Sequence, residues 1–276
     1  MLKTHAAGVD ATPPAVLIER HHNVAYITLN RPAVLNALNE AMLNKLVHAF
    51  QTLSTDKDIG CVVLRGAGDG FMAGGDIKEF RTQMELPEAE RLHVFQSMLA
   101  RVGLLVEAMR AMPQPVIASV HGAAAGFGMS LVLACDLAIA AEDASFTLAY
   151  CHLGVTPDGG ATWFLPRLVG LKPAFEIAAL GERIEAPRAA DLRIINRVVP
   201  KDALAEATET LARRLASGPR QALARTKALL NAAFGAPLPD QLRREGESFS
   251  RCTLTGDFIE GVSAFVEKRR PTFNRG

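Results

Sequence analysis

The sequence of 276 residues predicts an α/β protein in which crossover connections join the strands. Short apolar runs alternate with stretches of helical spacing, glycine-rich segments follow two of these runs, and beyond about residue 203 helical runs follow one another. We therefore expect a mobile N-terminal arm over residues 1–14, an α/β core over residues 15–202 and a helical C-terminal region over residues 203–276.

The core begins with two apolar runs, 16–19 and 24–29, which predict strands joined through residues 21–23. Asn39 is suited to cap the helix that follows, because its side chain can accept a hydrogen bond from an unpaired backbone N–H. The apolar positions expected along this helix are Met42, Leu46, Phe50 and Leu53.

The middle of the chain continues the alternation. Strands are predicted at 61–64, 116–120 and 136–140, and a helix over 87–112 is ended by prolines 113 and 115. The apolar residues expected on one side of that helix are Leu92, Phe95, Leu99, Val102 and Val106.

Composition excludes several classes of function. The 30 Lys+Arg residues nearly balance the 29 Asp+Glu residues, so the net charge of +1 provides no field that would attract nucleic acid. No uninterrupted apolar run reaches the roughly 20 residues of a membrane helix. The N-terminus lacks a signal-peptide core, and the four cysteines have no C-x-x-C spacing. We expect a cytoplasmic protein with no disulfide framework and no metal site.

Two glycine-rich segments, 71–78 and 122–130, each follow an apolar run at a predicted transition from strand to helix. Glycine allows a backbone to approach a ligand closely, and the start of a helix leaves N–H groups without internal partners. Two such N–H groups directed at one point would form an oxyanion hole. This pattern indicates chemistry at a carbonyl group.

The motifs together resemble the crotonase family, the enoyl-CoA hydratase/isomerase superfamily. The segments that carry the resemblance, in chain order, are 29–32 with 35–38, then 71–78, 122–128, 135–137 and 260–269. The resemblance implies a spiral of β-β-α turns and a helical trimerisation region, in a homotrimer or a dimer of trimers. It also implies an acyl-CoA thioester as substrate, coenzyme A being part of that substrate, with no separate cofactor.

The resemblance assigns the two oxyanion donors to the backbone N–H groups of Gly75 and Phe127. The family usually has glycine at the second position, so the ring of Phe127 must point away from the thioester oxygen. Phe265 and Lys268 are expected near the coenzyme A of a neighbouring subunit. The positions implied for binding of the acyl-CoA are Ala33, Val34, Leu35, Ala73, Asp76, Ile77, Lys78, Gly126, Ser130, Tyr150, Phe265 and Lys268.

Hydratases of this family hold a water with two glutamates, and the matching positions here are Ser130 and Tyr150. Neither side chain is a base near pH 7. The nearest acid in the motif is Asp158, and the segment around it resembles the branch of ring-1,2-epoxyphenylacetyl-CoA isomerases and Δ3,Δ2-enoyl-CoA isomerases. We therefore expect an isomerase of phenylacetate or fatty acid catabolism with Asp158 as its single acid/base. The apolar neighbours expected to raise the pKa of Asp158 are Leu153, Val155, Trp163 and Phe164.

Simpler interpretations remain for these residues. The sequence around Asp158 is also that of an ordinary turn, Asp76 is a helix cap, and Lys78 is either a phosphate contact or a solvated side chain. Ser130 is a small helix residue. Tyr150 either packs in the core, which we favour, or lines the acyl pocket or donates a hydrogen bond.

Three other functions stay open. A hydratase would need Asp158 and Tyr150 to position a water. A dehalogenase-like hydrolase would use Asp158 as a nucleophile with the help of a histidine. A non-catalytic acyl-CoA binder would keep the oxyanion donors alone.

Overall fold

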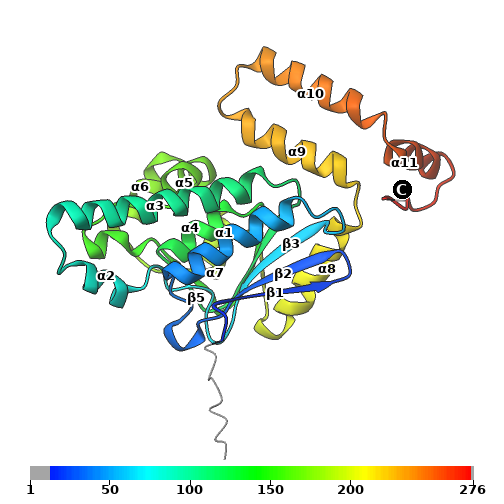
Figure 1. Ribbon diagram of the computed structural model, residues 1–276. Helices are drawn as coiled ribbons and strands as arrows, with labels where there is room; N and C mark the ends of the chain where they lie inside the picture. The colour runs from blue at the N-terminus through cyan, green and yellow to red at the C-terminus, as the bar shows by residue number, and fades with distance from the viewer. Residues whose placement is uncertain (1–12, 275–276) are drawn as a thin grey trace, which may run out of the picture.

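A six-stranded sheet forms the centre of the computed structural model, which describes residues 13–274 (Figure 1). The first two strands form an antiparallel hairpin, and every later neighbour is parallel. Most of the expected arm over 1–14 lies outside the described residues. In spatial order the strands are β1 (Val16–His21), β2 (Val24–Leu29), β3 (Cys61–Gly66), β4 (Val116–Val120), β6 (Leu137–Ala141) and β9 (Arg197–Val199).

A second sheet contains three very short strands, β5 (Ala123–Ala125), β7 (Ser145–Thr147) and β8 (Ile184–Glu185). The chain passes from β4 to β5, through a helix to β6, and then to β7, so it steps repeatedly from the large sheet to the small one. This is the expected spiral of β-β-α turns. The strands of the small sheet did not stand out in the sequence, because two or three residues are too few to show alternation.

Helices cover both faces of the large sheet. Along β2, Val24 and Tyr26 pack with the helix α8 (Leu204–Ala216), whereas Ala25 and Ile27 join the larger core cluster on the opposite face. Successive strand residues point to opposite faces, so the continuous apolar run is what a sheet buried on both sides requires. Although α8 lies beyond residue 203, it packs against four strands of this sheet.

The helices α1 (Glu40–Ser54) and α3 (Glu88–Ala111) lie against each other on the larger core. The side chain of Asn39 caps α1 by accepting a hydrogen bond from the Met42 N–H at 3.0 Å, as expected. The remaining helical elements up to residue 203 are η1 (Pro32–Val34), α2 (Ile77–Gln83), α4 (Phe127–Ala134), η2 (Ala149–Leu153), α5 (Ala161–Val169), α6 (Leu171–Leu180), α7 (Ala186–Asp191) and η3 (Lys201–Ala203).

The apolar residues expected on one side of α3 are buried only in the second half of the helix. Val102 and Val106 are buried, whereas Leu92 is 58% exposed and Leu99 is 40% exposed. The helix therefore runs past the end of the core that its second half covers. Within residues 13–274, α3 is also the one helix that is long and apolar enough to cross a membrane. Core helices of soluble proteins meet the same criterion, so this finding is weak evidence for a membrane span.

The last three helices are α9 (Arg220–Ala233), α10 (Leu238–Cys252) and α11 (Gly256–Val266). They extend away from the sheets, and α11 with the C-terminus lies farthest out (Figure 1). The large apolar side chains exposed on them and their connections are Leu230, Phe234, Leu238, Leu242, Phe249, Leu254, Phe258, Ile259, Val262, Phe265 and Val266.

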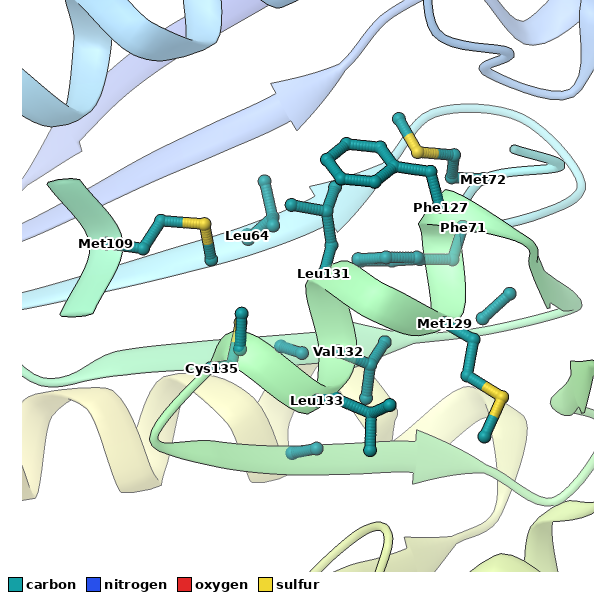
Figure 2. Packing of buried hydrophobic residues seen from close by; sticks show 14 of the residues in the cluster. Leu64, Phe71, Met72, Met109, Phe127, Met129, Leu131, Val132, Leu133 and Cys135 are labelled. Atoms are coloured by element: carbon teal, nitrogen blue, oxygen red, sulfur yellow. The ribbon is translucent and has the colours of Figure 1, made fainter. Parts of the chain in front are cut away.

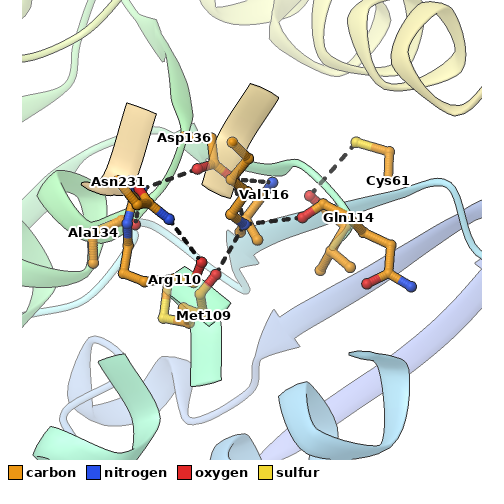
Figure 3. A network of polar contacts seen from close by, with 10 residues as sticks. Cys61, Met109, Arg110, Gln114, Val116, Ala134, Asp136 and Asn231 are labelled. Atoms are coloured by element: carbon orange, nitrogen blue, oxygen red, sulfur yellow. Dashed lines mark hydrogen bonds and ion pairs between the residues drawn. The ribbon is translucent and has the colours of Figure 1, made fainter. Parts of the chain in front are cut away.

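A partly buried polar network centred on Asp136 fastens α9 to the core (Figure 3). The carboxylate of Asp136 lies 2.7 Å from the Lys227 ammonium and 2.9 Å from the Arg110 guanidinium. It also accepts a hydrogen bond from the Val116 N–H at 2.8 Å. Burial lowers the pKa of Lys227, and the charge of Asp136 opposes this shift. Arg110 is further hydrogen-bonded to Asn231 of α9.

Candidate active site

The two glycine-rich segments lie against each other. Ala125 donates a backbone hydrogen bond to the Met72 carbonyl at 2.8 Å. A Cβ atom added at Gly74 would lie 3.2 Å from the Ala125 carbonyl oxygen and 3.6 Å from the Phe127 nitrogen. Gly74 has φ +99° and Gly126 has φ +50°, conformations that glycine adopts readily. Glycine at these positions thus allows the two backbones to meet.

The N–H groups of Gly75 and Phe127 therefore belong to adjoining backbone segments. Neither N–H makes a hydrogen bond to another residue between 13 and 274. Phe127 is the first residue of α4, where the helix leaves N–H groups unpaired and the helix dipole favours negative charge. The absence of a partner among these residues is what the expected role of the two donors requires.

The ring of Phe127 lies in the core (Figure 2). The residue is 3% exposed and belongs to the same buried cluster as Met72 and Leu131. A Cβ atom added at Gly159 would lie 2.7 Å from this ring, so the turn that contains Gly159 rests on it. Burial of the ring agrees with the expectation that phenylalanine can occupy this position without blocking its own N–H group.

Asp158 occupies the turn that precedes α5. Its carbonyl accepts a hydrogen bond from the Ala161 N–H at 3.1 Å, and the two intervening glycines, Gly159 and Gly160, have φ of +59° and +79°. The interpretation of the segment as a turn is therefore correct for the backbone. The side chain has a further partner, because the Tyr150 hydroxyl donates a hydrogen bond to Asp158 Oδ1 at 2.5 Å.

Ser130 joins the same group. Its hydroxyl lies 3.0 Å from the Tyr150 hydroxyl and donates to the Asp158 carbonyl at 3.1 Å. Tyr150 packs in the core, as the favoured interpretation expects, and its hydroxyl also contributes the hydrogen bond of the alternative interpretation. The two positions that the resemblance matches to the hydratase glutamates thus carry hydroxyl groups that are hydrogen-bonded to each other and to Asp158. These long-range contacts leave no periodic signal in the sequence.

Burial raises the pKa of Asp158, and the hydrogen bond from Tyr150 lowers it by a smaller amount. The direction agrees with the expectation, but its source differs. Leu153, Val155 and Trp163 are each more than 40% exposed and are poor sources of desolvation, so Phe164 is the one buried side chain of the expected set.

The expected binding positions 33–35, 73 and 76–78 come together beside Gly75, and most of them lie at the surface. Ala73 donates to the Leu35 carbonyl at 2.9 Å, and Leu35 and Ile77 expose about half of their surfaces. Ala33, Ala73 and Lys78 are also exposed, and Val34 is partly buried.

Asp76 caps α2 by accepting from the Lys78 N–H at 3.1 Å, as its position at the helix start predicts. It also pairs with Arg31 at 2.9 Å. Burial raises the pKa of Asp76, but the hydrogen bonds from Arg31 and the Lys78 N–H outweigh it, and the net shift is downward. Asp76 thus links the start of α2 to the loop that contains Arg31. The pairing with Arg31 is a contact that the sequence did not reveal.

Asn36 is a second residue that sequence reasoning missed. It is fully buried with φ +57°, and its amide group donates to the carbonyls of Ala67 and Gly70 at 2.8 and 2.9 Å. Its side-chain oxygen accepts from the Arg31 N–H. Asn36 thereby fixes the surface loop of residues 31–38 to the segment that leads into the first glycine-rich stretch. The available signal was the asparagine itself, because asparagine adopts the left-handed backbone region more often than most residues do.

Phe265 and Lys268 are not brought to this group of residues within one chain. Both are exposed at the end of α11, away from the sheets (Figure 1). An apolar hollow lies between α9 and α11, lined in part by Pro219, Phe258 and Phe273, and it is separate from Asp158.

Gly128→Ala should destabilise the fold, because the new Cβ would lie 2.3 Å from the Met72 carbonyl oxygen. Such overpacking costs about 1–3 kcal/mol. Gly103→Ala in α3 is the matched control, since nothing lies within 4 Å of that Cβ and alanine favours a helix by about 1 kcal/mol over glycine. Urea unfolding of both variants checks the pair. A Gly128→Ala protein as stable as Gly103→Ala would contradict this account of the contact.

Comparison with known proteins gives one family throughout. Residues 19–276 match the family model described as enoyl-CoA hydratase/isomerase. The chain is 36% identical over 258 residues to the 1,2-epoxyphenylacetyl-CoA isomerase of Escherichia coli, covering 94% of this chain and 97% of the relative. It is 32% identical over 256 residues to the short-chain-enoyl-CoA hydratase of Clostridium acetobutylicum, covering 92% and 95%.

The fold matches equally well. A crystal structure of an enoyl-CoA hydratase from Mycobacterium smegmatis superposes with a TM-score of 0.88 at 38% identity, covering 94% of this chain and 99% of that chain. Sequence, fold and the two adjoining glycine-rich segments agree: the chain belongs to the enoyl-CoA hydratase/isomerase family, the crotonase superfamily.

Proposed function

We propose that this enzyme isomerises an acyl-CoA thioester through an enolate, with Asp158 as its acid/base. Members of the family act on acyl-CoA thioesters, and relatives named as isomerases and as hydratases both match the chain. The observation that carries the proposal is the surroundings of Asp158. It is a carboxylate beside the first turn of α4, and hydroxyl groups of Ser130 and Tyr150 occupy the positions that match the hydratase glutamates.

The chemistry follows from these groups. The Asp158 carboxylate removes the proton from the carbon next to the thioester carbonyl. The electron pair moves onto the carbonyl oxygen, where the N–H groups of Gly75 and Phe127 stabilise the negative charge. In a 3-enoyl thioester the resulting dienolate takes the same proton back at the γ carbon, which shifts the double bond. One donor of this kind contributes roughly 3 kcal/mol to the lowering of the barrier.

A ring epoxide fits the same arrangement, and the isomerase name of the Escherichia coli relative supports that class of substrate. We further propose that residues 33–35, 73 and 77–78, all exposed except the partly buried Val34, hold the coenzyme A part of the substrate. The exposed apolar side chains of α10 and α11 support assembly into a trimer or a dimer of trimers, in which Phe265 and Lys268 would reach the substrate of a neighbouring subunit. The reaction as proposed requires no separate cofactor.

The hydrolytic alternative needs a histidine beside the aspartate. The two histidines nearest to Asp158 in the sequence bond elsewhere: His152 with the Gly181 carbonyl at 3.1 Å, and His121 with the Gly68 carbonyl at 2.8 Å. This observation favours the isomerase over the hydrolase.

The proposal is tested by incubating the enzyme in D₂O with 3-enoyl-CoA and, separately, with crotonyl-CoA. We expect the 3-enoyl thioester to give the 2-enoyl product, because one carboxylate suffices for that proton transfer. Mass spectrometry and absorbance of the conjugated thioester measure the products. Rapid hydration of crotonyl-CoA without any double-bond shift would identify a hydratase instead. Tight binding of both thioesters with no proton exchange would identify a binder.

A further inference from the structure

Ser130, Tyr150 and Asp158 form a hydrogen-bonded chain in which each donor can be assigned. The Tyr150 hydroxyl gives its single proton to Asp158 Oδ1 at 2.5 Å. Ser130 is therefore the donor in its 3.0 Å contact with Tyr150, and it shares its single proton with the Asp158 carbonyl at 3.1 Å and the Gly126 carbonyl at 3.4 Å. Ser130 is fully buried and Tyr150 is 8% exposed, so bulk water does not compete for these bonds.

The two oxygens of the Asp158 carboxylate are not equivalent. Oδ1 accepts the short bond from Tyr150, whereas Oδ2 makes no hydrogen bond or ion pair with any residue between 13 and 274. A phenol held in the core is a rigid donor, because its hydroxyl lies in the ring plane at a fixed reach. The bond to Tyr150 thus fixes the rotamer of Asp158 and leaves a single oxygen unengaged.

Charged groups play little part in this arrangement. Besides Tyr150, the titratable side chains on the elements packed around Asp158 are Cys151 and His152 of η2 and Arg167 of α5, and α4 carries none. His152 bonds to the Gly181 carbonyl, Cys151 lies 3.9 Å from His152, and Arg167 stacks 3.9 Å from the Trp163 ring. Burial and the Tyr150 hydroxyl are therefore the influences that set the basicity of Asp158.

We propose that Tyr150, supported by Ser130, is a positioning residue that holds Asp158 Oδ1 and makes Oδ2 the oxygen that carries the proton between carbons. This inference rests on the proposed isomerase and adds the residues that set its working pH. Tyr150 itself stays protonated, because burial and the neighbouring Asp158 charge raise its pKa far above the usual value of 10. It is a permanent donor that stabilises the ionised carboxylate.

Tyr150→Phe should move the acid limb of the pH profile of kcat/KM upward. Asp158 must be ionised to accept a proton, so activity is lost as the pH falls through its pKa, which burial already holds above 3.8. Without the Tyr150 donor the ionised form loses its hydrogen bond, and the limb should rise by about one to two pH units. Ser130→Ala, which removes a more distant donor, should shift it in the same direction by less.

Tyr26→Phe is the matched control, because Tyr26 is the other tyrosine of the chain and lies on the sheet face covered by α8. Its profile should match that of the wild type. Far-UV circular dichroism and thermal unfolding establish that each variant is folded; if Tyr150→Phe does not fold, the direction of the Ser130→Ala shift decides the matter. Folded variants with an unshifted acid limb would overturn the inference.

Failure of this inference is distinguishable from failure of the proposed function. If Asp158→Asn is inactive while Tyr150→Phe keeps the wild-type profile, Asp158 remains the acid/base and the positioning role of Tyr150 is wrong. If Asp158→Asn is as active as the wild type, the proposed function itself is wrong.

Discussion

Replacing Asp158 with asparagine should lower kcat for the double-bond shift by about 10²- to 10⁴-fold, the range that a general acid/base contributes. Asparagine has nearly the same shape and can still accept the hydrogen bond that Tyr150 donates to Asp158 at 2.5 Å. It cannot accept a proton from carbon at neutral pH. The N–H groups of Gly75 and Phe127 are unaffected by the change, so the thioester should still bind.

Steady-state rates with 3-enoyl-CoA and calorimetric binding of a non-reactive acyl-CoA measure the two effects separately. Asp202→Asn provides the control, because Asp202 is an exposed aspartate of η3. It should keep wild-type rates and binding. An Asp158→Asn enzyme with undiminished isomerisation would show that another group carries the proton.

Asp136→Ala should lower the free energy of unfolding by about 3–5 kcal/mol, the usual cost of removing one member of a buried ion pair. The change would leave two cations, Lys227 and Arg110, without the carboxylate that lies 2.7 and 2.9 Å from them. The Val116 N–H would also lose its acceptor. Because Lys227 belongs to α9, the attachment of that helix should weaken most.

Urea unfolding followed by circular dichroism gives the stability, and hydrogen exchange of α9 shows where the loss is concentrated. Glu247→Ala is the control, since it removes an exposed ion pair with Arg243 on α10 and should produce no measurable change. Equal effects of the two substitutions would mean that the network around Asp136 adds little to stability.

Local signals explain why so much of the fold could be predicted. The segment that begins at Asn39 shows both a capping residue and apolar residues at helical spacing. In the structure Asn39 caps α1, and the apolar residues form its buried face. The apolar runs of β2, β3 and β4 fill strands buried on both faces. The glycine-rich segments were informative because Gly74 and Gly126 adopt backbone conformations that few other residues adopt.

Contacts between distant segments account for what was missed. The bond from Tyr150 to Asp158, the pairing of Arg31 with Asp76 and the link from Lys227 to Asp136 each depend on how the chain folds back on itself. The exposed first half of α3 has the same explanation. Its apolar spacing is regular, but whether Leu92 and Leu99 are covered depends on how far the neighbouring core extends.

The oxyanion donors that we propose at Gly75 and Phe127 are main-chain groups, which has a consequence for how this scaffold can change. A substitution alters a side chain but, unless it introduces proline, it cannot delete an N–H. Substitutions at residues 130, 150 and 158 can therefore replace one acid/base side chain with another, while the two main-chain N–H groups still stabilise negative charge on the thioester oxygen. This separation makes those three positions the natural targets for redirecting the enzyme in the laboratory towards a new reaction.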